Sequence, residues 1–247
     1  MKKKQRNRRD FLKTVGTVGA TGLAAAVGGN AVADAQSPAG SEKTRPSGDP
    51  AGAPVSHAYT FLTAPEAAFI EAAVDRFIPA DDLTPSGTDC GVAVFIDRQL
   101  AGAWGSGDRT YMQGPWQKGV PTQGYQSPLT PAEFFRAGIA AANAYCRKTL
   151  QKDFDRLTVD QQNKVLHDLE QGRVTFEGGV SAQEFFNLLL ANAMQGFFAD
   201  PVYGGNRDKA AWKMIGFPGV IAIYSEHIKT YRNKKYDVEP KSILDLS

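Results

Sequence analysis

The sequence predicts a mostly α-helical protein of about five to seven helices, joined by long irregular loops that are rich in aromatic residues. Three observations predict this class: helix start signals at four places, apolar residues that recur every three or four positions after them, and the lack of a long alternating pattern typical of strands. The 247 residues are 42% hydrophobic and 22% charged. They suffice for one core and exclude a wholly disordered chain and a polytopic membrane protein.

The helix starts are capping boxes, in which a hydroxyl residue precedes a Glu or Gln by three positions. The four pairs are Thr63–Glu66, Thr130–Glu133, Thr158–Gln161 and Ser181–Glu184. Together with one further apolar stripe that stops at Gly102, they predict helices over 64–78, 91–101, 131–150, 159–171 and 182–197. Two long loops are expected between them, at 102–129 and 199–220.

The fifth helix, 182–197, is apolar on nearly all sides. A helix with so little polar face is either buried at the centre of the domain or covered by a partner. The sequence leaves both alternatives open.

Residues 1–35 are expected to be an export signal. Arg8 and Arg9 precede Phe11 and Leu12 in a pattern that resembles the twin-arginine signature, and an uncharged stretch follows. The small residues Ala33 and Ala35 then supply a cleavage site. A permanent membrane anchor is the alternative interpretation, although five glycines in the uncharged stretch argue against stable insertion.

The remainder divides into a linker and one domain. Residues 36–57 contain four prolines and cannot form a core, so the folded helical domain is expected over 58–247. The signal carries seven basic and two acidic residues, whereas the other 212 residues carry 21 basic and 24 acidic ones. A mildly acidic body gives no indication of a nucleic-acid partner.

No local motif for a cofactor, a metal or a nucleophile is present. The sequence has no Cys-x-x-Cys-His, no dinucleotide or phosphate loop, no paired metal-ligand histidines and no Gly-x-Ser-x-Gly. A signal for folded export on such a chain suggests that the cofactor is held by another chain that crosses with it. Rapid folding of this chain alone is the other explanation for that export route.

Seven residues near the end of the fifth helix are candidates for a partner interface, because aromatic and Arg side chains dominate many interfaces. They are Phe197, Phe198, Tyr203, Asn206, Arg207, Asp208 and Trp212. For the aromatic residues of 102–129 the sequence leaves two alternatives equally open, a partner interface and packing against the helices. A catalytic role is the less favoured interpretation for Asp200, Arg207 and Asp208. The pattern is explained more simply if Asp200 caps the turn before Pro201 and the other two set the loop or contact the partner.

Three segments resemble the gluconate 2-dehydrogenase subunit 3 family. They are Phe77–Asp81, Gly91–Leu100, and Gly196–Asp208 with its continuation through Trp212 to Gly219. The resemblance covers roughly residues 58–230. It implies a non-catalytic small subunit of a periplasmic, membrane-associated complex, with no catalytic, cofactor or metal residues to transfer.

The resemblance also implies partners. A FAD-dependent flavoprotein of the glucose-methanol-choline type would oxidise gluconate or another sugar substrate, and a multihaem cytochrome c would pass the electrons to the membrane. The small subunit would assist maturation and export of the flavoprotein through the twin-arginine translocon, at the outer face of the inner membrane. A stand-alone periplasmic enzyme or a binding module with a scattered site is the alternative.

Cys90 and Cys146 are the only cysteines. An oxidising compartment permits a disulfide between them or from one of them to the flavoprotein, and the sequence does not choose.

Overall fold

The computed structural model describes residues 58–108, 110–117, 119–120, 123, 125–221 and 223–246. The chain divides into two units, Ala58–Lys118 with Tyr125–Ser247, and Met1–His57 with Gly119–Gly124. In the smaller unit the backbone N–H of Gln123 donates to the carbonyl of Val120. The predicted signal residues Arg8, Arg9, Phe11, Leu12, Ala33 and Ala35 and the linker 36–57 lie outside the described residues.

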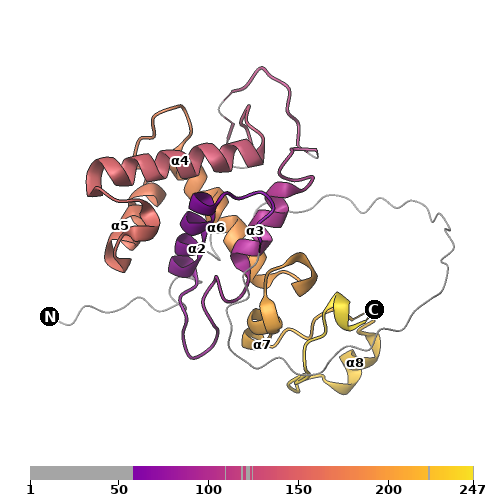
Figure 1. The fold of residues 1–247 in the computed structure, drawn as a ribbon. Coiled ribbons are helices and arrows are strands. Elements are labelled where there is room, and N and C mark those ends of the chain that lie inside the picture. Colours follow the sequence, from indigo (N-terminus) through magenta and orange to yellow (C-terminus); the bar gives the residue numbers. More distant parts are fainter. Residues whose placement is uncertain are drawn as a thin grey trace, which may run out of the picture. The chain divides into compact units, whose positions relative to one another are not determined.

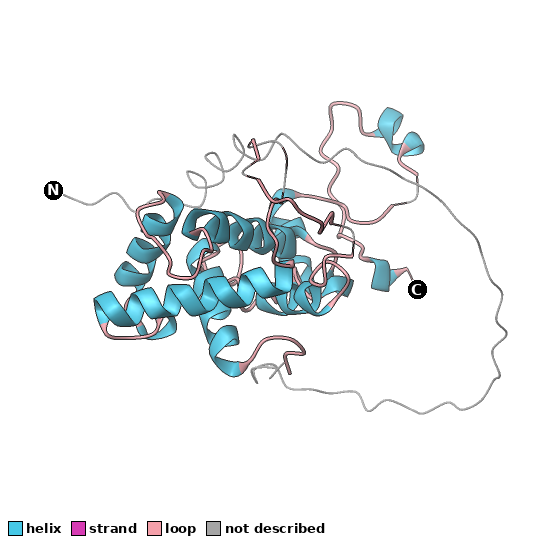
Figure 2. Ribbon diagram, turned by 90° about the horizontal axis from the view of Figure 1, so that it is seen from above, coloured by secondary structure: helices cyan, strands magenta, loops and turns pink. Residues whose placement is uncertain are grey.

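The described part of the larger unit consists of helices and loops and contains no strand, as predicted (Figures 1 and 2). The α-helices are α2 (Ala64–Phe77), α3 (Val92–Ala101), α4 (Pro131–Leu150), α5 (Val159–Glu170), α6 (Ala182–Phe198), α7 (Ala210–Ile215) and α8 (Ser225–Thr230). Short 3-10 helices are η1 (Phe154–Arg156), η2 (Pro201–Tyr203), η3 (Arg207–Lys209) and η4 (Ile243–Asp245).

All four predicted helix starts are confirmed, and three of them are reciprocal capping boxes. At Ser181 the hydroxyl accepts from the N–H of Glu184, but the Glu184 side chain gives no bond back. The ψ angle of Ser181 is 122°, against 161°, 158° and 157° at the threonine caps. The fourth start is therefore a single cap, with a smaller ψ at the capping residue than the three boxes have.

The helix α6 is central. It packs against α2, α3, α4, α5 and α7, and in Figure 1 it lies among the other long helices. Phe185 and Leu189 of α6 are fully buried. At Gly138 of α4 a Cβ atom would lie 2.1 Å from the Phe185 ring, so glycine allows the close approach of the two helices. Of the two alternatives left open by its sequence, the structure therefore shows central burial.

The Phe185 ring is the middle of an aromatic core. Ring centroids of Phe69, Phe135 and Phe176 lie 6.0, 6.1 and 6.2 Å from it, and Phe154 stacks on Phe69 at 4.7 Å. Tilted and edge-to-face pairs at these distances add to the gain from burial. The core thereby connects α2, α4, η1 and the first turn of α6.

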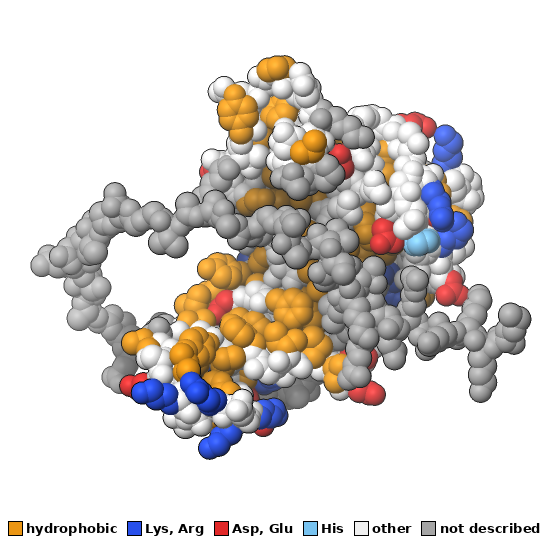
Figure 3. Space-filling model, turned by 180° about the vertical axis from the view of Figure 1, so that it is seen from behind, with side chains coloured by type: hydrophobic (Ala, Val, Ile, Leu, Met, Phe, Trp, Pro, Cys, Tyr) orange, Lys and Arg blue, Asp and Glu red, His pale blue; other side chains and the backbone are white. Residues whose placement is uncertain are grey.

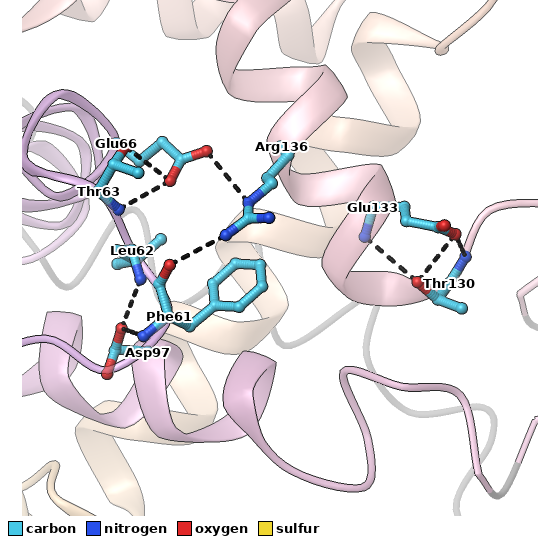
Figure 4. Close-up of polar contacts among 8 residues, drawn as sticks. All are labelled: Phe61, Leu62, Thr63, Glu66, Asp97, Thr130, Glu133 and Arg136. Atoms are coloured by element: carbon cyan, nitrogen blue, oxygen red, sulfur yellow. Dashed lines mark hydrogen bonds and ion pairs between the residues drawn. The ribbon is translucent and has the colours of Figure 1, made fainter.

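The segment that enters α2 is held by one carboxylate (Figure 4). Asp97 of α3 is 2% exposed and accepts from the backbone N–H groups of Thr60, Phe61 and Leu62 at 2.8–2.9 Å. It also accepts from the Thr60 hydroxyl at 2.8 Å. The pKa of Asp97 is lowered, because these bonds outweigh desolvation, which alone would raise the pKa. We call this arrangement the entry clamp.

A second side chain reinforces the entry clamp from α4. The guanidinium of Arg136 lies 4.2 Å from the centre of the Phe61 ring, donates to the Phe61 carbonyl at 3.1 Å, and pairs with Glu66 at 3.5 Å (Figure 4). The start of the domain is thus fixed to α3 and α4 before α2 begins.

The prediction of one long loop over 199–220 is wrong in part, because this region contains η2, η3 and the helix α7. The apolar pattern of α7 is only six residues long, which is too short for a periodic signal. Its start is instead set by the buried side chain of Asn206, described below.

Candidate docking surface

The connection from α6 to α7 begins with a capped turn at Asp200. One carboxylate oxygen of Asp200 accepts from the N–H of Val202 at 3.0 Å, and Pro201 occupies the first position of η2. This is the turn role that the sequence favours over catalysis. The second oxygen accepts from the N–H of Ile243 at 2.9 Å, so the same carboxylate also holds η4.

Asn206 ties the two helices together. Its side chain is fully buried, its Nδ2 donates to the carbonyl of Ala199 at 2.9 Å, and its Oδ1 accepts from the N–H of Ala211 at 2.9 Å. The first bond satisfies a carbonyl at the end of α6 and the second an N–H in the first turn of α7. Trp212 adds a third link, because its Nε1 donates to the carbonyl of Phe198 at 2.9 Å.

Glycines allow backbone segments to touch beneath this connection. A Cβ atom on Gly205 would lie 2.1 Å from the carbonyl oxygen of Gly196, and one on Gly91 would lie 2.4 Å from that of Gly204. Gly204 has a φ of 103°, in the left-handed region that favours glycine. Gly205 does not have a positive φ, so close approach rather than backbone conformation requires glycine there.

Three residues of this connection that are not glycine adopt the left-handed conformation: Asn206, Asp208 and Lys209, with φ between 48° and 57°. Such a conformation is uncommon for these residues and costs of order 1 kcal/mol each. Asn206 is held there by its two buried bonds and Lys209 by an ion pair with Asp245 at 2.9 Å. The surrounding contacts therefore fix a strained turn that projects from the core.

The last part of the described chain lies across this turn as a strap. Gly219 and Lys241 form an isolated bridge, and Lys213 of α7 pairs with Glu239 at 3.0 Å. The Lys209 ammonium and the backbone N–H of Ser242 lower the pKa of Asp245 to about 2, with the N–H bond the larger effect. The η4 helix is thereby placed beside η2.

Exposed hydrophobic side chains gather on this connection and strap. In Figure 3 such side chains cover the face over the part of the chain that holds α7 and α8 in Figure 1. We define the docking surface as the exposed residues Tyr203, Asp208, Ile215, Phe217, Ile243, Leu244 and Leu246. Half of the Tyr203 side chain and more than half of Leu244 and Leu246 are open to solvent. Several such residues on two adjoining segments favour an interaction surface.

The seven residues predicted for the interface separate into three groups. Phe197, Asn206 and Trp212 are buried and hold the connection together, and Phe198 and Arg207 are half-buried. Only Tyr203 and Asp208 are exposed. The structure thus shows that most of the seven predicted residues stabilise the fold. The sequence did not predict the exposed residues of η4, because a helix of three residues is too short to show a helical period.

The aromatic residues of the first long loop divide between the two alternatives left open by the sequence. Trp104 packs edge-on against Phe135, and the Tyr125 hydroxyl donates to the Leu129 carbonyl at 2.6 Å. Tyr111, by contrast, is 75% exposed. The beginning and end of this loop are therefore part of the domain's own packing, and Tyr111 is available to solvent.

The structure does not join the two cysteines by a disulfide. Cys90 and Cys146 are 1% and 0% exposed, and burial raises the pKa of the Cys146 thiol to about 11. A thiol that is buried and protonated reacts slowly. In the described conformation neither sulfur is accessible to a partner chain.

The described residues contain no group of three or more His, Cys, Asp or Glu side chains that could hold a metal ion. An open depression of about 370 Å³ at the end of α3 is lined by Arg98, Gln99, Gly102, Ala103, Trp104 and Thr110. Arg98 is the only charged group in this lining, and its guanidinium donates to the Val202 carbonyl at 3.3 Å. Across the described part of the chain no helix is both long and apolar enough to cross a bilayer.

Comparison with known proteins identifies the family. The family model described as gluconate 2-dehydrogenase subunit 3 matches residues 64–219, which include α2 to α7 and most of the connection described above. Neither the comparison with curated proteins nor that with solved structures finds a match. The match covers more than half of the 247 residues, and the chain belongs to the gluconate 2-dehydrogenase subunit 3 family, the accessory subunit of a dehydrogenase complex.

Proposed function

We propose that this chain binds a FAD-dependent dehydrogenase of the glucose-methanol-choline type and assists its maturation and twin-arginine export to the periplasm. The observation that carries the proposal is the docking surface. Its hydrophobic side chains are held in place by buried bonds on one side and are open to solvent on the other.

The arrangement of this surface supports binding of a folded partner. Asn206, Asp200 and Trp212 fix the backbone of the connection, so Tyr203 and Phe217 are positioned before binding. Pre-positioned aromatic side chains lose little conformational freedom on association, which favours affinity. The exposed carboxylate of Asp208 adds a polar group at the edge of the surface.

The export part of the proposal is supported by the sequence. Arg8 and Arg9 precede Phe11 and Leu12 on a chain whose family is a dehydrogenase subunit. A partner bound in the cytoplasm would cross with this chain and then meet a cytochrome c subunit that takes its electrons. FAD and haem c belong in this proposal to the partner subunits.

The experiment co-expresses the partner flavoprotein with this chain, without it, or with Arg8→Lys/Arg9→Lys. We expect dye-linked dehydrogenase activity outside the cytoplasm only with the wild-type chain. With the signal variant the flavoprotein should stay in the cytoplasm and still co-purify with this chain. Equal activity outside the cytoplasm with and without the chain would rule out the export role, and failure to co-purify would rule out the complex.

A further inference from the structure

A second exposed surface lies after residue 219, outside the part of the chain that the family model matches. It is the segment Ile223–Tyr236, which contains α8 and the turn that follows. The ring of His227 lies 5.9 Å from that of Tyr231 and 5.2 Å from that of Tyr236, and the two tyrosine rings are 4.6 Å apart. This aromatic cluster gives the segment a defined fold.

Apolar side chains on this segment face solvent. Ile223 and Ile228 are 66% and 62% exposed, and Tyr224 and Tyr231 are also exposed. Isoleucine is among the residues most often buried, so two of them in the open within six positions indicate a surface that is covered in use.

The same segment is basic. Lys229, Arg232 and Lys234 are exposed and form no ion pair with another described residue, while Lys235 pairs with Asp237 at 2.9 Å. Four of the 21 basic residues that follow Ala35 and only one of the 24 acidic ones lie in 223–236. The segment thus has a net charge of +3, and the other residues after Ala35, with 17 basic and 23 acidic, have a net charge of −6.

We propose that Ile223–Tyr236 is a peripheral membrane contact that binds an anionic lipid surface. Exposed isoleucine and tyrosine beside free lysine and arginine are the composition of interfacial membrane segments, because the apolar groups enter the headgroup boundary while the cations meet lipid phosphates. An acidic protein is the other class of partner with complementary charge. Lysine is depleted in protein–protein interfaces, and three of the four basic residues here are lysines, which favours lipid.

The proposal goes beyond the proposed function and stands independently of it. It concerns contact with the bilayer surface by this chain itself. The docking surface and the membrane contact are separate sets of residues, so the two can be altered one at a time.

The test measures co-sedimentation of the full chain with vesicles of phosphatidylcholine alone or with about 30% phosphatidylglycerol. Because the seven basic residues before Thr14 also attract anionic lipid, every protein in the test carries Gln at those positions. We expect binding to the anionic vesicles only, weakened by salt. Lys229→Glu/Arg232→Glu/Lys234→Glu should lower the partition coefficient by about tenfold or more.

The matched control is Lys148→Glu/Lys152→Glu/Arg156→Glu, which changes the net charge equally at exposed residues of the helical body. It should alter partitioning by less than about threefold. A second readout places an environment-sensitive dye on Ile228→Cys, or on Leu83→Cys as the control, since both native cysteines are buried. Only the dye at 228 should shift to the blue on adding anionic vesicles.

Equal partitioning of the two triple variants, or no dye shift at 228, would overturn the proposal. The charge-reversal variant at 229, 232 and 234 could also lose binding to the partner flavoprotein while its vesicle binding stays the same. That result would overturn the proposal and assign the segment to protein contact.

Discussion

At the scale of single residues, Asn206 carries the connection between α6 and α7. Asn206→Ala removes two buried hydrogen bonds, leaves the Ala199 carbonyl and the Ala211 N–H without their partner, and keeps a left-handed residue. We expect a loss of about 3 kcal/mol in the free energy of unfolding, measured by chemical denaturation. Asn163→Ala in the exposed part of α5 is the control and should change stability by less than about 0.5 kcal/mol.

Asp97 makes stability depend on pH. Its folded pKa is below the ordinary carboxyl value, so its contribution is complete above the unfolded pKa of about 4 and is lost as pH falls through the folded pKa. Asp97→Asn should cost about 2 kcal/mol at neutral pH and should flatten the fall in stability from neutral to acidic pH. Asp82→Asn, at an exposed carboxylate, is the control. If the stability of Asp97→Asn fell between neutral and acidic pH as steeply as that of the wild type, the role given to Asp97 in the entry clamp would be contradicted.

At the scale of elements, two glycines are required for different reasons, one for close backbone approach and the other for a positive φ. At Gly205 an added Cβ meets the backbone of Gly196, whereas at Gly216 it meets nothing and the residue only has a φ of 71°. Gly205→Ala should therefore destabilise the fold by about 3 kcal/mol or more, and Gly216→Ala by about 1 kcal/mol. Thermal unfolding compares the two, and equal costs would show that backbone contact beneath the connection is unimportant.

The long elements could be predicted from the sequence and the short ones could not. Thr130 and Pro131 start α4 and its apolar stripe continues to Leu150, so both bounds follow from local chemistry. By contrast α7 depends on a bond from Asn206, five residues from the N–H that it satisfies. A single bond from one side chain leaves no periodic signal in the sequence.

The same distinction applies to the candidate site. Aromatic and polar residues in a loop predicted a partner interface over this segment, but Asn206 and Trp212 turn inward to satisfy backbone groups. Which side chains of such a motif face solvent depends on the backbone conformation, and composition does not specify it. The exposed side chains of η4 are placed by contacts distant in sequence, among them the bond from the Ile243 N–H to Asp200 and the ion pair of Asp245 with Lys209.

At the scale of the whole molecule, the docking surface can be changed without touching the core. Tyr203→Ser/Ile215→Ser/Leu244→Ser removes three exposed apolar groups and should weaken binding of the flavoprotein by at least about 100-fold. Titration of the purified proteins measures the affinity, and denaturation should show little change in stability. Leu83→Ser, a similarly exposed residue outside the surface, is the control, and equal affinities for all variants would exclude this surface.

The entry clamp also has a mechanical consequence. A pull on the chain ahead of Tyr59 first meets the hydrogen bond that the Tyr59 hydroxyl donates to Glu71 in the middle of α2. It then meets Thr60–Leu62, where one carboxylate holds three N–H groups and a hydroxyl, and Arg136 holds the adjoining carbonyl. These bonds share the load among α2, α3 and α4. Tension on that end is therefore borne by the middle of the helical body, and α2 does not peel away turn by turn.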